Sequence, residues 1–259
     1  MLEVIRFETR GLVGLATIDR QERRNALSGE LCDELRTTLD GHRDLRAIVI
    51  TGAGSAFCAG ADLVTRFEPA ESGSEVPVDS FRPAFELVLD AIVDHPAPVI
   101  AAINGPAMGA GMQLAVACDL RVAVPGARMA IPGGKLGVHL SARNIWRLAH
   151  LAGQGAARDF LLAGHTVDAE GAYRLGIVQR LADDAVAAAL AVAGEIAASA
   201  PLTVQGHKRA LNLVLEAQWL EAAARDEIGA LEAAAFASED LQEGMAAFTE
   251  KRTPTFKGR

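Results

Sequence analysis

Two glycine-rich stretches carry the residues best suited to chemistry. CAGADL (58–63) and GPAMGAGMQ (105–113) each follow a short apolar run and each lead into a helix-like pattern. The amides of Ala61 and Ala110 are predicted to lack a backbone acceptor there, because the first N–H groups of a helix have no partner within it. Two such amides aimed at one oxygen would stabilise a thioester carbonyl as it becomes an enolate.

The glycines of these stretches allow a second interpretation. Gly60, Gly109 and Gly111 are small enough to let a helix pack closely against a strand, with no ligand involved. For either stretch alone, packing explains the glycines at least as well as anion binding does. The occurrence of two similar turns in one chain favours the anion-binding interpretation.

The surrounding elements should bring the two turns together. RAIVIT (46–51) and PVIAAI (98–103) read as strands covered on both faces, and an amphipathic helix is predicted near 81–94. Strands that alternate with helices indicate a parallel or mixed sheet, whose ligands bind at the carboxyl ends of the strands. Beyond about residue 141 the pattern is almost all helical, and we assign its alanine-rich stretches to assembly.

Composition excludes several classes of function. The chain has 259 residues, 50% hydrophobic and 22% charged, which is typical of a globular protein. A net charge of −8 argues against nucleic-acid binding. The sequence contains no run of about 18 apolar residues, so we expect no membrane span. The first residues do not resemble a secretory signal, and Cys32, Cys58 and Cys118 read as reduced, buried thiols rather than disulfides or metal ligands. We therefore expect a cytoplasmic protein.

Four segments together resemble the enoyl-CoA hydratase/isomerase (crotonase) superfamily. They are ERRNALS (22–28), TGAGSAFCAGADL (51–63), AAINGPAMGAGMQLAVACDLRVA (101–123) and FTEKRTPTF (248–256). The resemblance implies an α/β fold, a crotonase-type spiral of ββα units followed by a C-terminal helical trimerisation region. It places the acyl-CoA-binding core in 1–198 and the helical region in 199–259, with assembly as a homo-trimer or hexamer.

The resemblance also implies the ligand and its contacts. The ligand is a fatty acyl-CoA or enoyl-CoA thioester, with no metal and no other cofactor, and Ala61 and Ala110 match the two oxyanion-hole amides. Arg23 and Arg24 would by themselves suggest a solvated turn, but in this context a phosphate role is favoured. The positions implied to contact substrate or CoA are Arg23, Arg24, Ala26, Ala59, Gly60, Asp62, Leu63, Gly109, Gly111, Pro132, Phe248 and Lys251.

The sequence departs from a hydratase at both catalytic carboxylates. The resemblance places these at Gln113 and Gly133, and neither residue can act as an acid or base near neutral pH. General acid–base groups contribute on the order of 10²–10⁴ in rate, so ordinary hydration should be weak or absent. We therefore predict an acyl-CoA-binding protein of fatty-acid metabolism.

Two alternatives remain open at this stage. The protein could be an active hydratase or isomerase that uses other groups, such as His139, Ser141 or Asp62. It could instead be a scaffold with a vestigial pocket. The loop at 67–80 and the helix after it are expected to border the acyl pocket, and Leu87, Leu89 and Ile92 could line the pocket or face the core.

Overall fold

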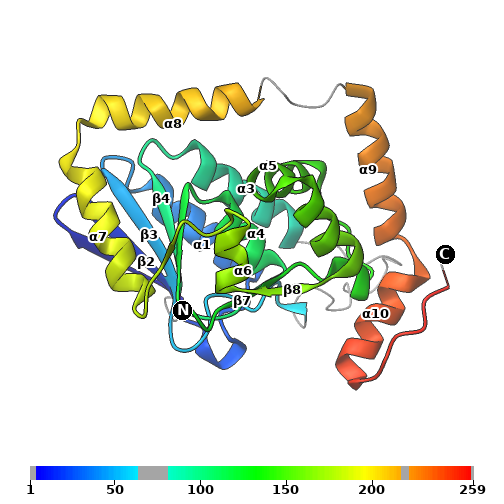
Figure 1. Ribbon diagram of the computed structural model, residues 1–259. Coiled ribbons are helices and arrows are strands. Elements are labelled where there is room, and N and C mark those ends of the chain that lie inside the picture. Colours follow the sequence, from blue (N-terminus) through cyan, green and yellow to red (C-terminus); the bar gives the residue numbers. More distant parts are fainter. Residues whose placement is uncertain (1–3, 64–80, 217–221, 258–259) are drawn as a thin grey trace.

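The computed structural model describes residues 4–63, 81–216 and 222–257 (Figure 1). Its centre is a six-stranded sheet with the order β1-β2-β3-β4-β6-β9. β1 and β2 form an antiparallel hairpin, and every other neighbouring pair in this sheet is parallel. The strands are β1 (Ile5–Arg10), β2 (Val13–Ile18), β3 (Ala47–Gly52), β4 (Val99–Ile103), β6 (Leu120–Ala123) and β9 (Arg180–Leu181).

A second sheet of three short strands lies beside the first. It contains β5 (Ala107–Met108), β7 (Arg128–Ala130) and β8 (Thr166–Asp168). β8 and β9 fall in the region that the sequence predicted to be almost all helix, so that expectation was wrong for these two segments. With three and two residues, they are too short to show the alternation that identifies a strand.

Helices surround both sheets. Ser28 accepts a hydrogen bond from the Leu31 amide at 3.3 Å and so begins α1, and α8 begins at Pro201, a residue suited to the first turn of a helix. The helices are α1 (Gly29–Asp40), α3 (Phe81–Asp94), α4 (Ala110–Ala117), α5 (Ala142–Arg158), α6 (Ala169–Arg174), α7 (Ala185–Ala198), α8 (Pro201–Glu216), α9 (Ala222–Phe236) and α10 (Glu239–Glu250). Short helical turns are η1 (Gln21–Arg23), η2 (Gly133–Lys135) and η3 (Asp159–Ala163).

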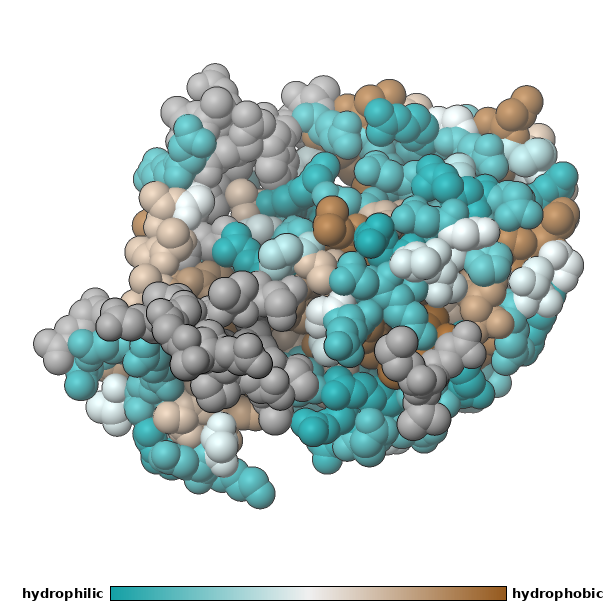
Figure 2. All heavy atoms as spheres, turned by 180° about the vertical axis from the view of Figure 1, so that it is seen from behind, coloured by the Kyte–Doolittle hydropathy of each residue, from teal (hydrophilic) through white to brown (hydrophobic). Residues whose placement is uncertain are grey.

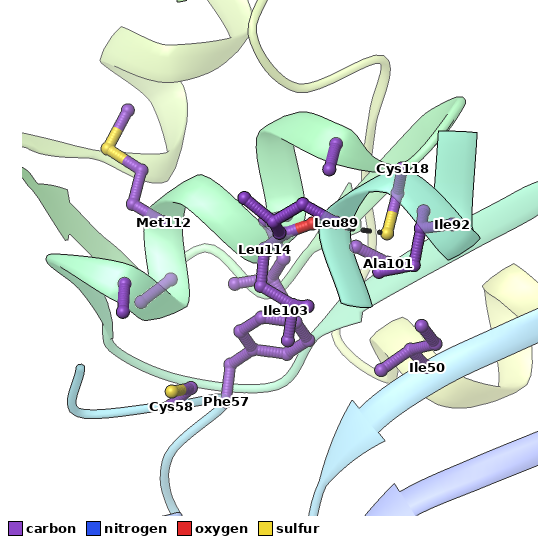
Figure 3. Close-up of a cluster of buried hydrophobic side chains, with 14 of the residues drawn as sticks. Ile50, Phe57, Cys58, Leu89, Ile92, Ala101, Ile103, Met112, Leu114 and Cys118 are labelled. Atoms are coloured by element: carbon purple, nitrogen blue, oxygen red, sulfur yellow. Dashed lines mark hydrogen bonds between the residues drawn. The ribbon is translucent and has the colours of Figure 1, made fainter. Parts of the chain in front are cut away.

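The main core lies between one face of the large sheet and helices α1, α3 and α4. β3 is buried along its whole length, and alternate side chains such as Ile50 point into this core (Figure 3). Leu89 and Ile92 of α3 also point into it, whereas Leu87 is 53% exposed. Of the two roles considered for these three side chains, Leu89 and Ile92 take the core role.

The opposite face of the sheet is covered by α7. Ala189 and Ala193 of this helix are fully buried against side chains such as Val49 and Ile100. The sequence assigned this alanine-rich segment to assembly, and for α7 that role stays a prediction. Its small side chains let the helix approach the sheet closely, so one face of α7 belongs to the core of its own chain.

α8, by contrast, buries little. Lys208 is its buried residue, and its ammonium donates to the carbonyls of Ile92 and Ala97, both at 3.1 Å, and pairs with Asp119 at 2.7 Å. Figure 2 shows apolar atoms exposed along the upper edge, where α8 runs. In the described part of the chain no single helix is long and apolar enough to cross a membrane. Taken together, α7 and α8 pass this test of length and composition. They are bent by 111° relative to each other.

Candidate functional site

The two glycine-rich turns lie against each other beyond the ends of β3 and β4. The Met108 amide donates to the carbonyl of Cys58 at 2.9 Å, and the Cys58 amide donates to Pro106 at 3.1 Å. Gly60 has φ +112°, and a Cβ placed there would lie 3.0 Å from the Met108 carbonyl oxygen and 3.8 Å from the nitrogen of Ala110. The backbone approach is so close that glycine is required at this point.

The amides of Ala61 and Ala110 both belong to this junction. α4 begins at Ala110, as predicted, so this N–H has no acceptor inside the helix. On the other turn, Leu27 accepts from the Asp62 amide at 2.7 Å and donates to the carbonyl of Gly60 at 2.8 Å, which leaves the Ala61 amide between them. Within the described residues, neither the Ala61 nor the Ala110 N–H makes a backbone hydrogen bond.

A cavity of about 500 Å³ opens at the junction. Its lining includes these predicted site residues: Arg23, Arg24, Ala26, Ala59, Gly60, Ala61, Asp62, Leu63, Gly109, Ala110, Gln113, Pro132, Gly133, His139 and Phe248. Two others do not line it. Gly111 is buried where an added Cβ would lie 2.4 Å from the carbonyl oxygen of Cys58, and Lys251 ends α10 with φ +54° and is exposed. The chemical roles given to these residues remain predictions.

α3 borders the cavity, as expected, but its contribution was not identified residue by residue. Phe81, Arg82, Phe85 and Glu86 line the wall, as do Ser141 and Asn144 at the start of α5. A signal for them exists in the sequence. Arg82, Glu86, Asp90 and Asp94 follow each other at intervals of four on a mainly apolar helix, which places them on one face. The residues of the predicted loop at 67–80 lie outside the described part.

Gln113 and Gly133 differ in how readily they could carry a carboxylate. Gln113 is half-buried on α4, where glutamate would have nearly the same shape. Gly133 begins η2, and a Cβ there would lie 2.5 Å from the carbonyl oxygen of Val138. Any side chain at position 133 therefore requires the loop after η2 to move.

Asp62 is held by cations rather than left open to substrate. Its carboxylate is buried, with Oδ2 lying 2.8 Å from Nη1 of Arg20 and Oδ1 3.6 Å from Nη1 of Arg23. These ion pairs tie the turn after β2 to the first glycine-rich turn. They favour a positioning role for Asp62 over a role as a proton acceptor.

Asn25 is a further residue that sequence reasoning missed. It is fully buried with φ +59°, a conformation that asparagine tolerates better than most residues. Its Nδ2 donates to the carbonyls of Ala53 and Ala56 at 2.9 and 2.7 Å, and its Oδ1 accepts from the Arg20 amide at 3.0 Å. Asn25 thus fastens the arginine-bearing turn to the loop that precedes the cavity.

The other titratable groups to be considered are a histidine at the cavity and three buried cysteines. His139 lines the cavity, and its Nδ1 lies 2.6 Å from the carbonyl of Leu140, which fixes the ring. Cys32, Cys58 and Cys118 are free and buried, as predicted, and burial raises the pKa of Cys58 and of Cys118 to about 12. Among the described residues, no group of three or more His, Cys, Asp or Glu side chains could hold a metal ion.

Comparison with known proteins extends over almost the whole chain. The family model "Enoyl-CoA hydratase/isomerase" matches residues 8–259. A probable enoyl-CoA hydratase, echA6, of Mycobacterium leprae is 41% identical over 95% of this chain and 96% of its own length. A putative enoyl-CoA hydratase of Thermus thermophilus is 38% identical over 95% of this chain and 98% of its own length.

Solved structures agree with this. Carnitinyl-CoA hydratase from Mycobacterium avium superposes with a TM-score of 0.85 at 33% identity and full coverage of both chains. An enoyl-CoA hydratase/isomerase from Pseudoalteromonas atlantica superposes with a TM-score of 0.84 at 32% identity, over 98% of this chain and 100% of the other. The fold is therefore the crotonase fold, and this chain belongs to the enoyl-CoA hydratase/isomerase family.

Proposed function

We propose that the protein binds fatty acyl-CoA or enoyl-CoA in the cavity between α3, α4 and α5, with weak or no hydratase activity. One observation carries the proposal. Gln113 and Gly133, where the resemblance places the two catalytic carboxylates, line the same cavity as the Ala61 and Ala110 amides, which are suited to polarise a thioester carbonyl. Hydration requires a group that activates water and one that delivers a proton, and neither glutamine nor glycine does this at neutral pH.

The charges at the cavity support a CoA ligand. Arg23 and Arg24 are exposed on the cavity rim, in a chain whose net charge is −8. Arg24 and Asn25 both have positive φ, at 49° and 59°. An exposed pair of arginines at the cavity rim is suited to the phosphates of CoA.

The proposal includes an oligomer and a cytoplasmic place in fatty-acid metabolism. The described parts of segment 199–259 contain α8, α9 and α10, and α8 exposes large apolar side chains of the kind that bind another subunit. They are Leu202, Leu211, Leu213 and Val214. A homo-trimer, or a hexamer made of two trimers, would cover them.

An enzyme that hydrates with other groups is the second candidate. His139 favours it, because it lines the cavity. Asp62 does not, because both of its oxygens face arginines.

The test uses the purified protein with crotonyl-CoA and with longer enoyl-CoAs, and follows loss of the conjugated thioester absorbance. We expect calorimetric titration with palmitoyl-CoA to detect binding and the hydration rate to be far below that of a family hydratase bearing both glutamates. Rapid hydration that is abolished by His139→Ala would support the second candidate. If palmitoyl-CoA gives no heat of binding and CoA shows no competition with it, a thioester site is refuted and a scaffold is favoured.

A further inference from the structure

α3 contributes a carboxylate to the cavity wall, in addition to the two glycine-rich turns and to Gln113 and Gly133. Glu86 is half-buried and lines the same cavity as the Ala61 and Ala110 amides and Gln113. Within the described cavity wall the other carboxylate is Asp62, which pairs with Arg20 at 2.8 Å.

The Glu86 side chain is held in place by α5, which lies beside α3 in Figure 1. Nδ2 of Asn144 donates to Oε1 of Glu86 at 2.8 Å, and the Ser141 hydroxyl also hydrogen-bonds to the carboxylate. Asn144 is itself buried, and its Oδ1 accepts from Nη1 of Arg147 at 3.0 Å. A carboxyl group fixed by two donors is oriented before any ligand arrives, as an acid–base group needs to be.

Several charges act on this carboxyl group. Arg82 and Asp90 lie on α3, one turn before and one turn after Glu86, and Arg147 faces it from α5. Burial raises the pKa of Glu86 above its ordinary value of 4.5, and Asp90 acts in the same direction, while the Ser141 hydrogen bond and the two arginines oppose the rise. A carboxylate with a raised pKa is a stronger base and gives and takes protons closer to neutral pH.

We propose that Glu86 moves protons on the bound acyl thioester, removing one from C2 and, when the chain has a 3,4 double bond, returning it to C4. The proposal rests on the proposed function of the cavity as a thioester site. The C2–H electron pair becomes part of a C1–C2 double bond, and the carbonyl π pair moves onto the thioester oxygen, which faces the Ala61 and Ala110 amides. Glu86 holds the proton as a carboxylic acid.

Return of the proton completes the cycle without any other reactant. Delivery to C2 restores the original thioester, so the net result in heavy water is exchange of the C2 hydrogens. Delivery to C4 restores the carbonyl and moves the double bond from C3–C4 to C2–C3. One carboxyl group suffices for either outcome, whereas hydration would need a second group at Gln113 or Gly133.

The experiment measures two proton-transfer rates. Proton NMR follows loss of the C2 signal of hexanoyl-CoA in heavy water, and absorbance follows conversion of 3-hexenoyl-CoA to the conjugated 2-enoyl thioester. Glu86→Gln keeps the shape and an acceptor for Asn144. Glu170→Gln is the matched control, because Glu170 is exposed on α6, pairs with Arg174 at 3.6 Å, and does not line the cavity.

We expect Glu86→Gln to lower both rates by about 10²–10⁴ while hexanoyl-CoA still binds in calorimetry, and Glu170→Gln to retain the wild-type rate. The wild-type rate should rise with pH to a plateau whose apparent pKa lies above 4.5. Equal rates in wild type and Glu86→Gln overturn the proposal, as does an absence of exchange in a wild-type protein that binds hexanoyl-CoA. Failure to bind hexanoyl-CoA at all refutes the proposed thioester site, and this inference with it.

Discussion

Gly60→Ala is the substitution that tests most directly whether the two turns form one anion-binding junction. Gly60 has φ +112°, and the added Cβ would lie 3.0 Å from the carbonyl oxygen of Met108, which is backbone and has little freedom to move. The strain of such a conformation is about 1–3 kcal/mol. Because Ala61 follows directly, relief of the strain turns its amide away from the cavity.

The loss of one amide donor sets the expected magnitude. A hydrogen bond to a neutral carbonyl contributes about 0.5–1.5 kcal/mol net, so affinity for hexanoyl-CoA should fall by about twofold to tenfold. Calorimetry measures this loss. Infrared difference spectroscopy with a carbonyl-labelled hexanoyl-CoA provides a direct readout, because the bound carbonyl should absorb at a lower frequency than the free one, and less so in Gly60→Ala.

Gly176→Ala is the matched control. Gly176 has φ +73°, but nothing lies within 4 Å of the position of its Cβ and it is remote from the cavity lining. It should lower the melting temperature through the strain of a positive φ, about 1–2 kcal/mol, and leave binding unchanged. An unshifted carbonyl band in wild type, or the same band and affinity in a folded Gly60→Ala protein, would refute the reasoning.

Two further predictions concern the walls of the cavity. Gly133→Ala should lower the melting temperature, because its Cβ would lie 2.5 Å from the Val138 carbonyl oxygen, whereas Gly134→Ala meets nothing closer than 3.9 Å and should be tolerated; equal melting temperatures would contradict this. Asn25→Ala should reduce the free energy of unfolding by about 2 kcal/mol or more in urea titration, since it leaves two buried carbonyls without this donor, each worth about 1–3 kcal/mol, and also removes the acceptor of the partly buried Arg20 amide. Asn212→Ala, which removes a single hydrogen bond, of 2.9 Å, is the control, and a similar loss in both variants would argue against the role given to Asn25.

Some features of the site could be predicted because their causes are local. A serine at position 28 caps the helix that follows it, and the glycines before Ala110 end a strand and leave the first amides of α4 free. The apolar runs of β3 and β4 fixed both strands, and α3 was predicted with its observed limits. The strand pattern also predicted that the two turns meet, and the resemblance to a family added the match of Ala61 and Ala110 to a pair of oxyanion-hole amides.

Other features depend on contacts between distant segments. The alanine-rich α7 has the same composition whether it covers a sheet or a second subunit, and only the tertiary structure places it on its own sheet. The resemblance places a catalytic carboxylate at position 133, whereas the fold puts the Val138 carbonyl oxygen 2.5 Å from the Cβ position of Gly133. Steric room is a property of neighbours, so sequence gave no warning of it.

By itself, the sequence determined where the bare amides of Ala61 and Ala110 lie along the chain, because glycine geometry and helix starts act over a few residues. The tertiary structure decided which side chains share a cavity with them. Glu86 meets Asn144, 58 positions away, only because α3 packs beside α5. Such a meeting depends on how whole elements pack, and packing is set by the complete core rather than by any short stretch of residues.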